Sequence, residues 1–75
     1  MKSTRDWKFE AKQLLRAELK RRDLTYADLA RRMDAIGLPV NDRTLANKIA
    51  TGAFSAVFFL QCLEAIGVKN LQLRD

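Results

Sequence analysis

The first apolar stripe of the chain predicts a helix over about residues 5–22. Its apolar residues are separated mostly by three or four positions, which places them on one side of an α-helix: Trp7, Ala11, Leu14, Leu15 and Leu19. Ser3 and Asp6 form the pattern of a capping box at the start. We expect Trp7 to lie in the core or at its edge. The basic side chains are expected roughly opposite this stripe: Lys8, Lys12, Arg16 and Lys20.

A second helix is predicted to start at Thr25. Thr25 and Asp28 form another capping-box pattern, and the residues that follow supply an apolar face at helical spacing: Tyr26, Leu29, Ala30, Met33 and Ile36. Gly37 is a natural helix stop, and Pro39 shows that the helix does not continue past it.

A third helix is predicted over about residues 42–50, with Asn41 or Asp42 as its cap. Leu45, Ala46 and Ile49 are expected to point inward. The side chains expected to point outward are all polar or charged: Arg43, Thr44, Asn47, Lys48 and Thr51. This helix should end at Gly52, since glycine is common just past a helix C-terminus.

A fourth helix is predicted from Ser55, its cap, to Ile66, with Gly67 as the stop. It is apolar on more than one face, and Phe59, Cys62 or Leu63, and Ile66 suffice to reach the core. Residues 68–73 alternate weakly and fit either a short strand or a helical turn. The chain is therefore expected to be all-α, a compact bundle of four or five helices. We expect residues 1–75 to form one domain, in which residues 1–4 and 70–75 could be loose ends.

Composition excludes several classes of function. The 75 residues include no histidine and one cysteine, so the common acid–base catalyst, a disulfide and a cysteine zinc site are all absent. We expect Cys62 to be a buried, inert thiol, and we expect no enzyme activity, metal or cofactor. No apolar run reaches the roughly 18 residues needed to cross a bilayer, and the start lacks a signal-peptide core. A cytoplasmic protein is expected.

The basic excess is confined to the first predicted helix. The net charge is +5, and residues 1–22 contain eight basic and three acidic side chains, whereas residues 23–75 contain equal numbers of each. A basic balance suggests a nucleic acid or another acidic partner. A charged face that only aids solubility is the alternative.

Three short segments resemble a known family when they are taken in order: LTYADLA at residues 24–30, IATG at residues 49–52 and LEAIGV at residues 63–68. Together with the helix caps, they resemble the phage repressor and Cro-like helix-turn-helix DNA-binding family, over about residues 10–70. The chain looks most like a small bacterial group of unassigned function within that family. The resemblance implies a repressor-like helix-turn-helix and a transcriptional regulator that binds double-stranded DNA as a homodimer.

The resemblance also implies which residues contact DNA. The third helix would be the recognition helix, with base contacts from Arg43, Thr44, Asn47 and Lys48. Arginine suits guanine, asparagine suits adenine, and threonine can bond a base or touch a thymine methyl. Phosphate contacts are expected from the starts of helices and the turn after the third helix: Thr25, Tyr26, Thr51 and Ser55. An ordinary solvated helix face is the alternative for the base-contact residues.

Two departures from the family pattern affect these expectations. Tyr26 stands where the family usually has glutamine, and a tyrosine hydroxyl can donate to a phosphate but cannot copy both contacts of an amide. The segment 34–41 is several residues longer than the usual turn, which leaves the angle between the second and third helices open.

The aromatic residues near the fourth helix suggest a second surface. Phe54, Val57 and Phe58 are expected to form a dimer or partner surface, because a helix with one inward face leaves some of them outside. A core completed by the folded-back tail is the alternative. The competing function is therefore a protein–protein interaction module on the same fold, which would use this aromatic helix. No membrane partner is expected.

Overall fold

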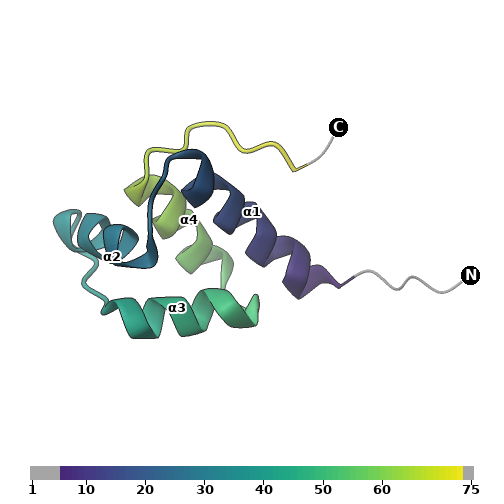
Figure 1. Cartoon of the computed structure of the whole chain (residues 1–75), viewed down its shortest axis with the longest axis horizontal. Helices are drawn as coiled ribbons and strands as arrows, with labels where there is room; N and C mark the ends of the chain where they lie inside the picture. The colour runs from purple at the N-terminus through teal and green to yellow at the C-terminus, as the bar shows by residue number, and fades with distance from the viewer. Residues whose placement is uncertain (1–5, 74–75) are drawn as a thin grey trace, which may run out of the picture.

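Four α-helices make up most of the part of the chain that the computed structural model describes, residues 6–73. They are α1 (Trp7–Arg21), α2 (Tyr26–Ala35), α3 (Asp42–Thr51) and α4 (Ala56–Ala65). Helix α1 packs against α3 and α4, and α2 packs against the same two helices. Figure 1 shows α4 behind the other helices, with α3 along one side of the molecule and the C-terminal segment along the other. The all-α fold predicted from the sequence is confirmed.

Polar side chains cap the start of every helix. Asp6, Thr25, Asn41 and Ser55 each accept a hydrogen bond from the backbone N–H three residues later, at 2.7–3.1 Å. Such caps satisfy N–H groups that have no partner within the helix, and each is worth about 1 kcal/mol. The predicted Thr25–Asp28 capping box is present. At α1 the cap is Asp6 itself, and Ser3 lies outside the described residues.

The core is built from one apolar face of each helix. Its fully buried side chains come from all four helices: Leu15, Leu29, Leu45, Ile49 and Cys62. The inward positions predicted for the third helix, Leu45 and Ile49, are confirmed. Burying a side chain of this size stabilises the fold by about 1.5–3 kcal/mol relative to exposing it, so this small set of residues holds the helices together.

Two predicted core residues are at the surface instead. Trp7 is 64% exposed and Ile36 is 45% exposed. Trp7 is the first residue of α1, whereas the buried residues of this helix, Leu15, Glu18 and Leu19, are further along it. Ile36 is the C-cap residue of α2, where the chain leaves the helix and no longer follows its apolar face. Helical spacing alone does not show how far along each helix the core extends.

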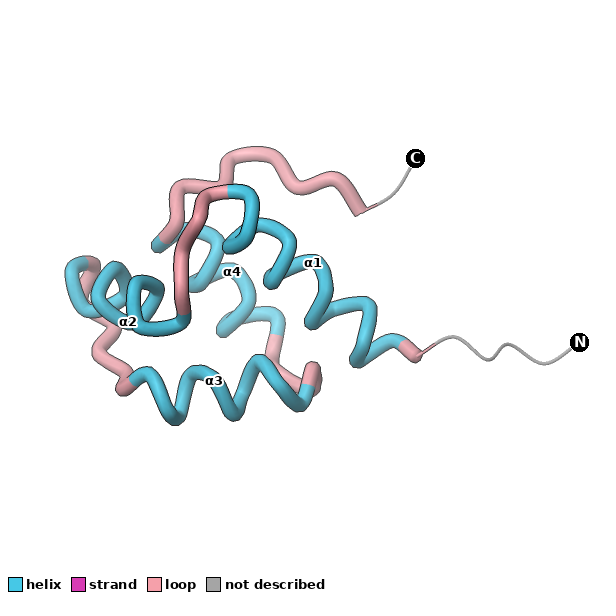
Figure 2. Tube along the Cα trace, in the orientation of Figure 1, coloured by secondary structure: helices cyan, strands magenta, loops and turns pink. Residues whose placement is uncertain are grey.

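The connection between α2 and α3, residues 36–41, is anchored to the core by hydrogen bonds and apolar contacts. Gly37 and Leu38 donate backbone hydrogen bonds back to Asp34 and Met33, at 3.0 and 2.9 Å. Leu38 and Val40 are half-buried against the core cluster. Residues 36–41 are drawn as a short loop in Figure 2, and its two apolar anchors fix where α3 begins.

The C-terminal segment forms neither of the predicted alternatives. Residues 68–73 have no helix or strand, and they run back over α1 (Figures 1 and 2). Val68 and Leu71 pack against the core cluster, so the described part of the predicted loose end, residues 70–73, is held through Leu71. Residues 74–75 and the other predicted loose end, residues 1–4, lie outside the described residues.

Helix α3 is joined to α1 by a close backbone contact at Gly52. This residue caps the C-terminus of α3 with a φ angle of +68°, a conformation that L side chains rarely adopt. A Cβ atom added here would collide with the backbone carbonyl of Lys8 in α1. Nearby, the ammonium of Lys12 donates to the carbonyl of Ala50, at 3.2 Å. The end of α3 therefore rests directly on α1.

We predict that Gly52→Ala destabilises the protein far more than Gly37→Ala. Both glycines have positive φ, but a Cβ at Gly37 would meet no atom within 4 Å. Backbone strain alone should cost about 1–2 kcal/mol at either position, and the collision with α1 should add about 1–3 kcal/mol at Gly52. Urea unfolding followed by circular dichroism measures both, and equal losses would contradict this contact.

Candidate functional site

The outer face of α3 carries the side chains predicted to read bases. Arg43, Thr44, Asn47 and Lys48 are all exposed. Positions three and four apart lie on one side of a helix, so Arg43, Thr44 and Asn47 share a face. Asn41 holds the start of this face in place, because its side chain accepts a hydrogen bond from the Thr44 backbone N–H at 2.7 Å. The structure therefore brings these three predicted residues together.

Lys48 differs from the other three because it contacts α4. Its ammonium nitrogen lies 4.9 Å from the centre of the Phe58 ring. A cation over an aromatic face gains roughly 0.5–2 kcal/mol. The charged end of Lys48 is thus directed toward the junction of α3 and α4, at the edge of the α3 face.

Two of the four hydroxyl groups predicted to contact phosphates donate hydrogen bonds within the protein. Thr25 donates to the Asp28 carboxylate at 3.0 Å, and Thr51 donates to the Lys48 carbonyl at 2.8 Å. A hydroxyl has one proton to donate, so both are already used within the protein. Ser55 differs, because its oxygen accepts from the Phe58 N–H and its own proton is not used by this bond.

The carboxylate of Asp28, in the first turn of α2, is stabilised in its charged form. The backbone N–H of Thr25 donates to this carboxylate at 2.8 Å, and Arg31 forms an ion pair with it. These interactions, the hydrogen bonds from Thr25 first, lower the pKa of Asp28 below its usual value. Asp28 is therefore ionised at neutral pH, and it neutralises the charge of Arg31 at this end of the molecule.

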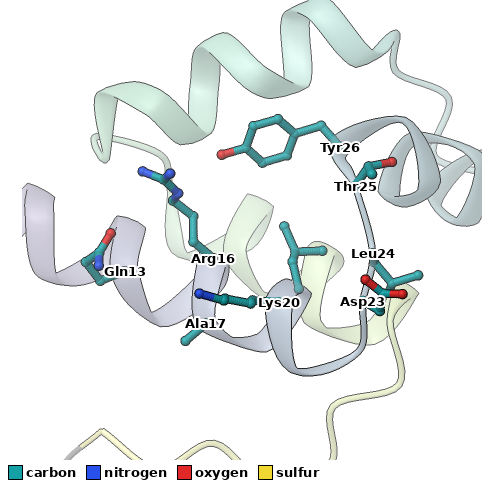
Figure 3. Close-up of a pocket in the computed structure, with 9 residues that line it drawn as sticks. Gln13, Arg16, Ala17, Lys20, Asp23, Leu24, Thr25 and Tyr26 are labelled. Carbon is teal, nitrogen blue, oxygen red and sulfur yellow. The ribbon is translucent and has the colours of Figure 1, made fainter.

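A surface pocket of about 660 Å³ lies between α1 and the start of α2. Its polar lining includes Gln13, Arg16 and Lys20 from α1, and Tyr26 and the N-cap residue Thr25 from the start of α2. In Figure 3, the Arg16 guanidinium and the Tyr26 hydroxyl point toward each other across the pocket. Tyr26 was predicted as a site residue from the sequence, but Arg16 and Lys20 were not.

The basic side chains at the C-terminal half of α1 and at its C-cap differ in whether a carboxylate neutralises them. Glu18 is buried and forms ion pairs with Arg21 at 3.3 Å and Arg22 at 2.5 Å. Arg16 and Lys20 are exposed, and within residues 6–73 neither forms an ion pair. Arg16 and Lys20 therefore leave uncompensated positive charge on the side of α1 that lines the pocket. The excess of basic residues over residues 1–22 was the sequence signal that pointed to this basic side of α1.

The predicted surface at α4 is only partly exposed. Phe58 is 7% exposed, so its assignment to a partner surface was wrong. Phe54 is half-buried, with its ring centre 5.8 Å from that of Phe58 and 5.7 Å from that of Phe59. Since each aromatic ring buries a large apolar area, the three rings close this end of the core. Two large apolar residues of α4 are exposed: Val57, which was predicted for this surface, at 64% and Leu60 at 63%.

Cys62 is confirmed as a buried thiol. Its side chain is fully buried, and burial raises its pKa to about 12. The thiolate is the reactive form of cysteine, so this group stays protonated and unreactive at neutral pH. Within residues 6–73, no group of three or more acidic, cysteine or histidine side chains is placed to hold a metal ion. None of the helices described is long and apolar enough to cross a membrane.

Comparison with known proteins places the chain in a family. Neither the comparison with curated proteins nor the comparison with solved structures found a similar protein. One family matches residues 7–71, which include all four helices and most of the C-terminal segment. The chain therefore belongs to the family described as a domain of unknown function, DUF6471.

Proposed function

We propose that this protein is a sequence-specific DNA-binding domain that places α3 in the major groove. The observation that carries the proposal is the exposed face of α3, where Arg43, Thr44 and Asn47 lie together on a helix whose other side is buried. An α-helix fits the width of the major groove of B-DNA. These three side-chain types can bond guanine, adenine and thymine edges, which gives the face the chemistry of base reading.

The proposal includes a helix-turn-helix formed by α2 and α3. The two helices pack against each other, and the connection between them is anchored by Leu38 and Val40. An anchored connection supports the proposal because it holds α3 at one angle, so its base-reading side chains reach the groove together. Their repressor-like arrangement is inferred from this packing and from the sequence resemblance.

Phosphate contacts are proposed for Tyr26 and Ser55. These two hydroxyls remain able to donate, whereas those of Thr25 and Thr51 donate within the protein. Lys48 is assigned to the edge of the interface, because its contact with Phe58 directs its charge to the junction of α3 and α4. The base contacts then come from Arg43, Thr44 and Asn47.

We predict that Arg43→Ala weakens binding to the preferred DNA sequence much more than binding to random DNA. A bidentate arginine–guanine contact is worth about 1–3 kcal/mol of discrimination, or roughly 5- to 150-fold. The preferred sequence comes from selection out of a random pool, and fluorescence anisotropy then measures both affinities. Lys69→Ala is the control, since it removes one exposed positive charge from the C-terminal segment, which runs along the side of the molecule opposite α3 (Figure 1). Equal losses on both DNAs would rule out base reading by Arg43.

The exposed side of α4 supports a homodimer. Val57 and Leu60 are three residues apart, so their side chains lie next to each other on the helix surface, and both are largely exposed. A two-fold dimer would bring two α3 helices to two half-sites of one DNA duplex. A protein–protein interaction module that uses this same pair of residues for a different partner is the second candidate function.

We predict that Leu60→Asp raises the dissociation constant of the dimer about tenfold or more, because a charge would enter an apolar contact. Leu73→Asp is a matched control, since Leu73 is as exposed as Leu60 but lies in the C-terminal segment. Sedimentation velocity over a range of concentrations measures both. A protein that is monomeric at every concentration, both alone and with the selected duplex present, would contradict the homodimer. If that monomer also failed to bind the duplex, the second candidate would be favoured.

A further inference from the structure

We propose that the pocket between α1 and the start of α2 binds the phosphate backbone of duplex DNA, with Arg16 and Lys20 as its cationic residues. This inference rests on the proposed DNA binding and extends the interface from α3 to α1. It assigns a role to the positive charge of α1, which takes no part in the base contacts proposed for α3.

The pocket has the donors that a phosphate group requires. Arg16, Lys20 and Gln13 project from successive turns of α1, and Tyr26 projects from the first turn of α2. Guanidinium and ammonium groups form the strong, charge-assisted bonds to phosphate, and a tyrosine hydroxyl adds a neutral donor. Figure 3 shows Arg16 and Tyr26 pointing into the same space from two different helices. A ligand there is held from both sides.

The two cations are available to a ligand. Glu18 neutralises Arg21 and Arg22 on another side of α1, and Asp28 pairs with Arg31 on α2. Arg16 and Lys20 have no such carboxylate partner within the described residues. Binding a phosphate would therefore break no existing ion pair, and it would release the counterions that the phosphate attracts.

The pocket lies on the side of α1 that faces the end of α3. Lys12, Arg16 and Lys20 follow one another at intervals of four residues, so they form one ridge along the helix. The ammonium of Lys12 bonds to the carbonyl of Ala50, in the last turn of α3. The ridge thus begins at α3 and continues to the start of α2. A DNA strand that borders the groove occupied by α3 can follow this ridge.

One carboxylate opposes the proposed ligand. Asp23 also lines the pocket, at the end beside Leu24 (Figure 3). Its φ angle is +56°, a left-handed conformation that asparagine tolerates as well as aspartate. Asp23→Asn therefore removes the negative charge without adding backbone strain, which makes it a variant that should gain affinity.

The test compares two double variants that each remove two positive charges. Arg16→Gln with Lys20→Gln empties the pocket of cations. Arg21→Gln with Lys69→Gln is the control, because Arg21 is on the same helix but lines a groove against the C-terminal segment, and Lys69 is in that segment. All four side chains are exposed, so circular dichroism should show that both proteins fold.

Binding to a random-sequence duplex is measured by fluorescence anisotropy from about 50 to 300 mM salt. The pocket variant should lower the slope of log K against log salt by about 1–2, since each neutralised phosphate contributes about 0.9. It should also bind about tenfold more weakly near 0.1 M salt, with its preference for the selected sequence unchanged. The control should change both quantities far less, and Asp23→Asn should bind every sequence more tightly than the wild type.

Three outcomes overturn the inference. If the two double variants lose equal affinity and slope, only total charge matters, and the pocket is not a phosphate site although DNA binding stands. If Asp23→Asn weakens binding, the pocket does not hold an anion. If the folded wild-type protein fails to bind duplex even at low salt, the proposed function and the pocket both fail, which separates that result from the first two.

Discussion

The close contact between Gly52 and the backbone of Lys8 fixes the relation between α3 and α1. Because no side chain separates the two backbones there, the end of α3 rests on the first turn of α1. Lys12 strengthens the same junction through the Ala50 carbonyl. The orientation of the polar α3 face and of the basic ridge on α1 both depend on this contact. A change that separated the two helices would alter the relative positions of both surfaces.

Charge is divided among the helices in a way that fits this arrangement. Residues 23–52 contain equal numbers of basic and acidic side chains, so the α2–α3 segment attracts a polyanion weakly by itself. The excess is on the first segment, and part of it is neutralised by Glu18. The uncompensated charges of Arg16 and Lys20 are next to the start of α2. In our account, α3 supplies specificity and α1 supplies much of the attraction to phosphate.

Local chemistry explains what the sequence predicted well. Caps at Thr25 and Ser55, and glycines after the helices, act over three or four residues, so helix positions were predictable to within about two residues. Trp7, Ile36 and Phe58 were misplaced because their exposure depends on how far along each helix the core extends and on which side of α4 meets the core. Arg16 and Lys20 were missed as site residues because the pocket that they line forms between two helices, which the sequence does not place side by side. Only the excess of basic residues in the first segment indicated this site.

The most direct test of the account is an NMR titration of the isotopically labelled protein with the selected duplex at low salt. Backbone amide shifts report which helices meet DNA, independently of any substitution. We predict the largest changes at Arg43, Thr44 and Asn47, with a second group at Arg16, Lys20 and Tyr26, and little change at residues 68–73. Changes confined to α4, or an unchanged spectrum with excess duplex, would contradict the account.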